Sequence, residues 1–324
     1  SKGHSLPAPE VGVVDYVPID FVSGYYQTTG AEWHRKKPTY LGGSDGWAGF
    51  WPDPIIPVNN IKLQPNQSRP IWLTFKVPQN AFAGNYKGTI KLICKNKTIN
   101  EVKYTLHIWD FEIPEKPNVK AIYDVRGSIN RWAPDGFADN DVKKAIWEFM
   151  SERRLCPDTI RPEPKIQFKN GKVEADFTAF DSAAKFYIEK LKLPHFYTPW
   201  QFYCFGWGLP PWNKFGEAPY SGVSPYEGID RENLRPEFKK AYQQCLKVFW
   251  EHLKSNGWDD ECILYISDEP FDNMPEIRKQ MKALCNMIHE VDSSIPIYSS
   301  TWHHQPEWDG YITVWGLGHY GIVP

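Results

Sequence analysis

One stretch constrains the fold more than any other: the apolar run over residues 262–267, followed by Asp268, Glu269 and Pro270. An apolar run of this length, with a long helical pattern on each side, predicts a strand buried on both faces of a parallel sheet. Pro270 predicts that the strand stops there and that Glu269 is extended. Acids at the C-terminal ends of such strands carry the chemistry in α/β barrels. They are also common as solvated turn residues or helix caps.

The first third of the chain has the alternation typical of strands, with turn residues between the runs. This pattern predicts a β-sandwich domain over residues 1–115 that includes an irregular N-terminal segment. The proline-rich residues 47–57 are expected to form a loop, and residues 111–118, which hold two prolines, a linker. The strands are expected at 11–16, 71–77, 86–94 and 100–109.

After residue 118 the pattern changes to alternating strands and helices, which predicts a (β/α)8-type TIM barrel over residues 118–324. Strand units are expected near residues 119, 159, 196, 263, 297 and 312. About eight are needed to close such a barrel, so this one appears truncated after about six. The alternatives are a fragment, an open barrel or strand units that the pattern does not reveal.

Composition excludes several classes of function. The net charge is -2 without blocks of like charge, so neither nucleic acid nor an anionic membrane surface is an expected partner. No apolar run reaches the roughly 18 residues of a membrane span. Six scattered cysteines without a CxxC pair predict mostly buried free thiols, and no cofactor or metal is expected. Aromatic residues make up 15% of the chain, including 15 Trp, which favours a carbohydrate ligand.

The location and assembly of the protein are less constrained. We expect an extracytoplasmic protein (secreted, periplasmic or surface-associated), although no signal segment is visible in the sequence. The sequons at Asn66 and Asn96 are weak support for this expectation. The oligomeric state is left open.

Three segments together resemble glycoside hydrolase family 123, the β-N-acetylgalactosaminidases and their uncharacterised relatives. They are the Trp-Pro-Asp-Pro loop at 51–54, the segment PQNAFAGNYKG at 78–88 and the run Ser-Asp-Glu-Pro at 267–270. The resemblance runs from about Val11 to Trp315 in matching order. It implies retaining hydrolysis of a terminal β-linked N-acetylgalactosamine, in which the 2-acetamido oxygen of the substrate attacks C1 and gives an oxazoline. Glu269 would then match the general acid/base, and Asp268 the residue that orients the acetamido nitrogen.

The adjacency of the two acids agrees with this mechanism. A retaining enzyme of the usual kind needs two carboxyls about 5 Å apart across the sugar, and substrate-assisted enzymes are an exception. Neighbouring residues reach one side of a sugar ring more easily than both sides. Two close carboxylates also disfavour double ionisation, which would help to keep Glu269 protonated. An inactive glycan-binding relative and a glycosidase of different sugar specificity are the alternative interpretations.

Further residues are candidates for binding the sugar because they belong to aromatic segments beside strand ends. A metal at His303 and His304 is disfavoured, since adjacent histidines diverge and the i, i+4 helical spacing is absent. For each candidate, ordinary core or loop packing is the competing interpretation. The predicted substrate-binding residues are Tyr203, Trp207, Tyr298, Trp302, His303 and Trp315.

Overall fold

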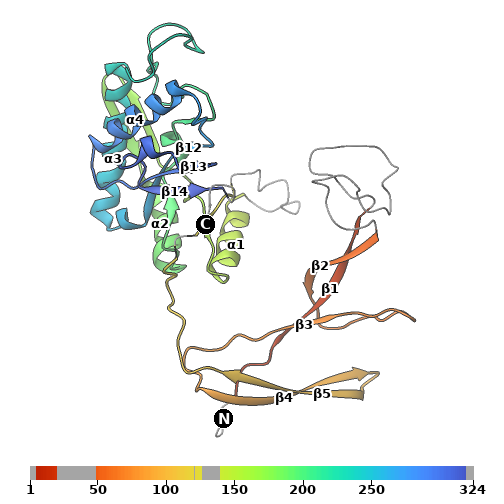
Figure 1. Ribbon diagram of the computed structural model, residues 1–324. Helices are drawn as coiled ribbons and strands as arrows, with labels where there is room; N and C mark the ends of the chain where they lie inside the picture. The colour runs from red at the N-terminus through yellow and green to blue at the C-terminus, as the bar shows by residue number, and fades with distance from the viewer. Residues whose placement is uncertain (1–4, 20–48, 120, 126–138, 319–324) are drawn as a thin grey trace. The chain divides into compact units, whose positions relative to one another are not determined.

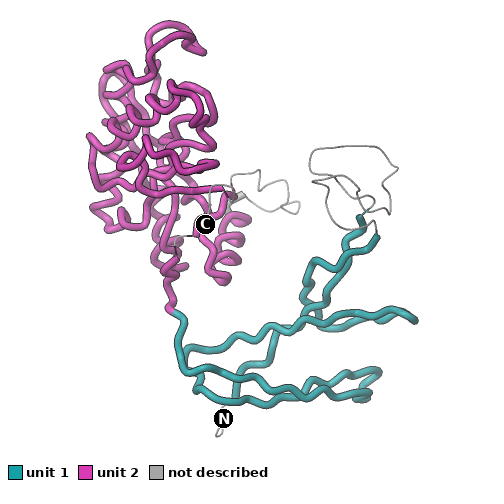
Figure 2. Tube along the Cα trace, viewed as in Figure 1, with its two compact units in different colours: residues 1–113 teal, residues 114–324 magenta. Residues whose placement is uncertain are grey.

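A structural division after residue 113 lies close to the change of sequence pattern that follows residue 118. In the computed structural model the chain forms two units, Ser1–Ile113 and Pro114–Pro324 (Figure 2). The structure describes residues 5–19, 49–119, 121–125 and 139–318, which carry the colours of Figure 1.

Unit 1 contains two antiparallel sheets. In the first, β1 (Glu10–Ile19) pairs with β2 (Gly49–Pro57) on one side and with β3 (Ile71–Thr74) on the other. The second is a hairpin of β4 (Gly84–Cys94) and β5 (Lys97–Ile108). Its two-residue turn is formed by Lys95 and Asn96, which both have the positive φ that suits a tight hairpin.

The prediction of a loop over residues 47–57 is wrong for its described part, which forms β2. Prolines usually argue against a strand because they cannot donate to the ladder. In this sheet β2 is an edge strand beside β1, and an edge strand needs backbone donors on one side only.

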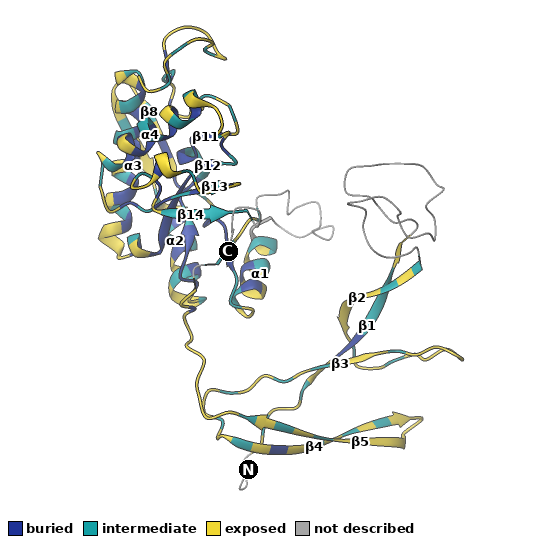
Figure 3. Ribbon diagram, in the orientation of Figure 1, coloured by how far each residue is buried: buried dark blue, intermediate teal, exposed yellow. Residues whose placement is uncertain are grey.

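The described residues do not confirm a β-sandwich in unit 1. Among them, Val13 and Tyr86 are the only buried hydrophobic side chains of the unit, whereas Trp72, Phe82 and Trp109 are exposed. Figure 3 shows the same contrast between the exposed sheets of unit 1 and the buried interior of unit 2. A sandwich requires two sheets that bury a shared apolar face, and these sheets leave theirs exposed.

Unit 2 is organised around short parallel strands that neighbour one another in chain order. β6 pairs with β7, a bridge from Thr159 to Tyr197 continues from β7 to β10, and β12, β13 and β14 follow. β11 (Phe205–Gly206) also pairs with β12, so all of these strands point the same way. The main strands are β6 (Ile122–Tyr123), β7 (Cys156–Pro157), β10 (Phe196–Tyr197), β12 (Cys262–Asp268), β13 (Ile297–Thr301) and β14 (Val314–Leu317).

These strands lie at or close to the positions predicted from the sequence. Their parallel order agrees with a barrel, but the described strands do not form a closed one, so a TIM barrel stays a prediction. Parallel strands bring their C-terminal ends to one edge of the sheet, where binding sites of α/β folds form.

Helices cover this sheet and supply most of the core. The core joins apolar residues of β12 and β13 to the buried faces of α3 and α4. A hairpin of β8 (Lys165–Lys169) and β9 (Lys172–Asp176) turns at Asn170-Gly171, where both residues have positive φ. The helices are α1 (Asp139–Ser151), α2 (Thr178–Ala184, continued by a π-helical segment at Lys185–Lys190), α3 (Pro236–Asn256) and α4 (Pro275–His289).

Two further expectations concern the cysteines and the membrane. All six cysteines are free thiols, and all but Cys94 are buried, which confirms the sequence interpretation. None of the helices in the described ranges has the length and apolar character needed to cross a bilayer.

Candidate active site

A bulge in β12 determines where Asp268 points. Leu264 and Ile266 belong to the helix-side core, whereas the ring of Tyr265 lies against other tyrosines on the opposite face. Strict alternation would send Asp268, three residues after Tyr265, to the helix side. However, Tyr265 pairs with Tyr298 and Ser267 with Ser299, so β12 holds one extra residue at this point. Such a bulge re-aims the residues that follow it.

The result is a direct contact between Tyr265 and Asp268. The Tyr265 hydroxyl donates to Asp268 Oδ1 at 2.9 Å. From the neighbouring loop, the Tyr203 hydroxyl accepts the backbone N–H of Asp268 at 3.1 Å. Burial, with the Asp268 charge as the next cause, raises the pKa of Tyr265 above its usual value, so its hydroxyl stays a donor at neutral pH.

Aromatic rings surround this contact. We use the name tyrosine cluster for Tyr197, Tyr203, Tyr265 and Tyr298. Ring centroids lie 4.9 Å apart for Tyr265 and Tyr298, 5.2 Å for Tyr197 and Tyr298, and 5.3 Å for Tyr203 and Tyr265. Closely packed rings leave little freedom for the two hydroxyls that contact Asp268.

The backbone at Glu269 differs from the prediction. Its φ is 43°, in the left-handed region, so the expectation of an extended residue before Pro270 is wrong. Two backbone hydrogen bonds explain the turn: Glu269 N–H donates to Ser300 O at 2.8 Å, and Trp207 N–H donates to Asp268 O at 3.0 Å. A conformation of this kind costs about 1–3 kcal/mol and is concentrated at functional sites.

Glu269 has an aromatic neighbour. Trp207 Nε1 donates to Glu269 Oε2 at 3.4 Å, and the φ of Trp207 is also positive, at 53°. Trp207 is 49% exposed, so the contact lies at the open rim of the site.

A cavity of about 220 Å³ opens beside Asp268. It is smaller than the roughly 300–1,000 Å³ of pockets that hold drug-sized ligands, so it suits one small ring. Aromatic rings make most of its wall, and one carboxylate is the charged group. The lining residues are Trp200, Tyr203, Gly206, Trp207, Leu209, Trp212 and Asp268.

The structure therefore brings together Asp268, Glu269, Tyr203, Trp207 and Tyr298 from the predicted set. Tyr298 joins through the tyrosine cluster: its hydroxyl lies above Gly316, where an added Cβ would come within 2.3 Å.

The other predicted residues lie elsewhere. Trp315 pairs with Ser299 rather than with Tyr298, which places its ring on the helix side of the sheet, stacked 6.5 Å from Trp308. Trp302 and His303 are exposed beyond the end of β13. In the described part of the chain, no group of three His, Cys, Asp or Glu residues could hold a metal ion.

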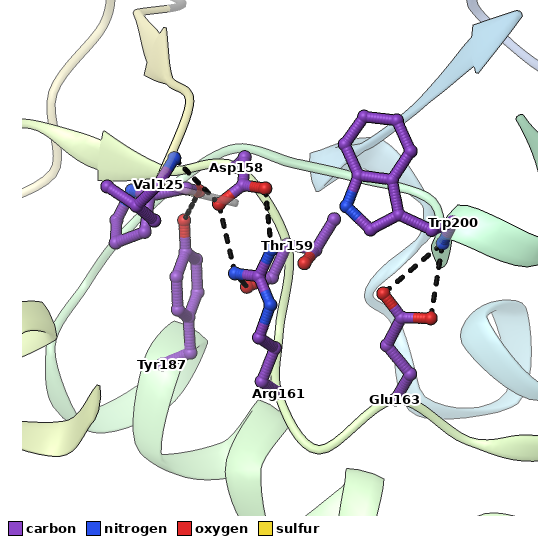
Figure 4. A network of polar contacts seen from close by, with 8 residues as sticks. Val125, Asp158, Thr159, Arg161, Glu163, Tyr187 and Trp200 are labelled. Carbon is purple, nitrogen blue, oxygen red and sulfur yellow. Dashed lines mark hydrogen bonds and ion pairs between the residues drawn. The ribbon is translucent and has the colours of Figure 1, made fainter. Parts of the chain in front are cut away.

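Sequence reasoning missed a charged network after β7, shown in Figure 4. Asp158 is fully buried and pairs with the Arg161 guanidinium through two contacts of 3.0 and 2.7 Å. Both carboxylate oxygens of Glu163 accept the backbone N–H of Trp200 at 3.2 Å. The network thus anchors the loop that forms the aromatic wall. Three charged residues within six positions of a strand end were the signal in the sequence.

Glu163 gives a prediction about stability. Burial raises its pKa above the usual 4.5, although the Trp200 N–H and the Arg161 charge oppose the shift. The folded state therefore holds this proton more tightly than the unfolded state. The stabilisation from this bound proton is complete at pH values below the pKa of Glu163 in the unfolded state. It is lost as the pH rises through the pKa of Glu163 in the folded state. We expect Glu163→Gln to raise Tm at pH 7 and to leave it nearly unchanged at pH 4. Thermal unfolding at both pH values checks this, with the exposed Glu148→Gln as control.

Two family models match the chain. Residues 33–93 match the glycoside hydrolase 123 N-terminal domain, and residues 164–316 match the glycoside hydrolase 123 catalytic domain. The second match contains both acids and most of the aromatic residues described above.

No curated protein matches the chain. A family 123 glycoside hydrolase from Clostridium perfringens, described for the hydrolysis of glycolipid glycans, is similar with a TM-score of 0.59 and 15% identity. The match covers 97% of this chain and 55% of that one, so this chain spans little more than half of that structure. A glycosyl hydrolase family 2 member from Bacteroides cellulosilyticus DSM 14838 matches with a TM-score of 0.31 and 12% identity, over 78% of this chain and 31% of that one.

Proposed function

Because the chain belongs to glycoside hydrolase family 123, we propose that it releases a terminal β-linked N-acetylgalactosamine from glycans or glycolipids. The observation that carries this proposal is the placement of Asp268. Asp268 lines a cavity for one small ring, its carboxylate accepts a hydrogen bond from the Tyr265 hydroxyl, and Glu269 is the next residue in the chain. The glycolipid glycans named for the Clostridium perfringens enzyme support the substrate class. An extracytoplasmic location is part of the proposal.

The proposed reaction has two steps. In the first, the acetamido carbonyl oxygen attacks C1 while Glu269 donates its proton to the leaving oxygen, and the C1–O bond breaks. The amide N–H meanwhile points at Asp268, whose negative charge stabilises the positive charge of the forming oxazoline. In the second, Glu269 takes a proton from water, which attacks C1, opens the oxazoline and restores the acetamido group with the original β configuration.

The structure supports this division of roles over a mechanism with an enzyme nucleophile. A nucleophile and an acid/base on opposite sides of the ring would lie about 5–5.5 Å apart across the sugar. Here the two acids are consecutive, and the walls around Asp268 are mostly aromatic. Aromatic walls suit the apolar C–H faces of a pyranose, and one carboxylate suits its amide.

A panel of aryl glycosides tests the proposal. We expect turnover of the β-N-acetylgalactosaminide, weaker turnover of the β-N-acetylglucosaminide, and none of the β-galactoside, which lacks the acetamido group. Turnover of the galactoside alone would favour a glycosidase of different specificity. Binding of the thiazoline analogue of N-acetylgalactosamine without turnover of any substrate would favour the glycan-binding alternative.

Tyr265→Phe tests the hydrogen bond from Tyr265 to Asp268 that the bulge makes possible. The change removes the hydroxyl that orients Asp268, so we expect kcat/KM to fall about tenfold, corresponding to one hydrogen bond to a charged group. KM should change little, because the ring and the cavity wall remain. Steady-state kinetics on the aryl β-N-acetylgalactosaminide check this, with Tyr311→Phe, a tyrosine packed on the helix side, as control. An unchanged kcat/KM in Tyr265→Phe would contradict it.

A further inference from the structure

α4 carries one fully buried amide, Gln280, on a face that is otherwise apolar. Its neighbours on that face include Ile277, Met281 and Leu284, all with no exposed surface. A buried amide is costly unless its hydrogen bonds are satisfied. Gln280 Nε2 donates to Leu209 O at 2.9 Å, and its Oε1 accepts from Arg231 Nη1 at 3.3 Å.

Arg231 also holds the residue before Leu209, which is Gly208. Its Nη1 also donates to Gly208 O at 3.0 Å. Arg231 is in turn fixed by Tyr220, whose hydroxyl contacts Arg231 O at 2.9 Å and Gln280 Oε1 at 3.3 Å. The carbonyls of two consecutive residues are thus held by side chains from α4 and from the loop before α3. Both residues directly follow Trp207.

On its other side, Trp207 is attached to the end of β12. Its N–H donates to Asp268 O, and its carbonyl accepts from Phe271 N–H at 3.1 Å. Gly208 packs closely here, since a Cβ at this position would lie 3.1 Å from the Phe271 ring. Trp207 is therefore held from both sides in a left-handed conformation, with its indole N–H directed at Glu269.

We propose that Gln280 and Arg231 are positioning residues, which hold Trp207 so that its indole N–H orients the Glu269 carboxyl. The inference rests on the proposed function, in which Glu269 protonates the leaving oxygen. Neither side chain lines the cavity beside Asp268, so both act through the segment 207–209. The requirement for accurate placement explains why a polar amide occupies a core position of α4.

The test compares two aryl β-N-acetylgalactosaminides, one with dinitrophenol and one with unsubstituted phenol as leaving group. A poor leaving group needs the proton from Glu269, whereas dinitrophenolate leaves without it. We expect Gln280→Leu to lower kcat/KM by up to about 10²-fold for the phenyl substrate and only slightly for the dinitrophenyl substrate. A loss of up to about 10²-fold is typical when a catalytic group is displaced by a small distance. Arg231→Met, which leaves the core of α4 intact, should show the same split to a smaller degree.

Hydrogen exchange of residues 205–212 provides a readout that does not depend on activity, and it should accelerate in Gln280→Leu. Gln243→Leu is the matched control, because Gln243 Nε2 donates to Met287 O and ties α3 to α4 away from the cavity. Equal losses on both substrates, or unchanged exchange, would overturn the inference. If the wild-type chain hydrolyses neither substrate, the proposed function fails, and exchange alone decides whether Gln280 holds the segment.

Discussion

Glu269→Gln is expected to lower kcat/KM by about 10²–10⁴-fold for a phenyl β-N-acetylgalactosaminide, which is the usual contribution of a general acid. Glutamine keeps the size of the side chain and can still accept from Trp207 Nε1, so the fold and the cavity should persist. It cannot donate a proton to the leaving oxygen. The loss should therefore be much smaller for a dinitrophenyl substrate, and hydrolysis of the oxazoline should become the slow step.

The control for this variant is Glu189→Gln, which makes the same change at an exposed position of the π-helical segment after α2. Steady-state and burst kinetics on both substrates check the prediction. A loss of equal size on the two leaving groups would contradict the role of Glu269 as the acid.

Asp268→Asn is expected to lower kcat/KM by about 10²–10³-fold, the usual loss when one charge-stabilising contact is removed from a reacting centre. Asparagine can still accept the hydrogen bond from the Tyr265 hydroxyl, so the side chain should keep its position. It lacks the negative charge that stabilises the oxazoline. Since attack by the acetamido oxygen is needed for every leaving group, the loss should be similar for phenyl and dinitrophenyl substrates.

Kinetics on the same two substrates also check this prediction. Asp260→Asn is the matched control, because Asp260 is an exposed acid just before the opposite end of β12. An unaltered rate in Asp268→Asn would mean that the acetamido group does not act through this carboxylate.

Local sequence signals predicted the parts of the fold that depend on neighbouring residues. The apolar run that ends at Asp268 predicted a buried parallel strand. Its side chains lie either against the helices or on the opposite face of the sheet, so both faces need apolar residues. The hairpin turns at residues 95–96 and 170–171 likewise depend on local chemistry, because Asn and Gly tolerate the positive φ found there. The position of the two acids at a strand end followed from the same local patterns.

The remaining features depend on pairing across the sheet, which the sequence does not display. The extra residue in β12 is visible only against β13, yet it decides that Asp268 faces Tyr265. Register likewise places Trp315 opposite Ser299 and so on the helix side. The left-handed turn at Glu269 depends on Ser300 O, a partner from another strand. Gln280 resembles any polar residue of an amphipathic helix until its carbonyl partners are known.

The most direct test of the proposed mechanism concerns the source of the nucleophile. Fluorine substitution in the acetamido group withdraws electrons and weakens the attack of its carbonyl oxygen. Across aryl β-N-acetyl-, N-fluoroacetyl- and N-trifluoroacetylgalactosaminides, kcat/KM is expected to fall steeply as the number of fluorine atoms rises. A kcat/KM that is independent of fluorination would contradict it, because the sugar would then not supply its own nucleophile.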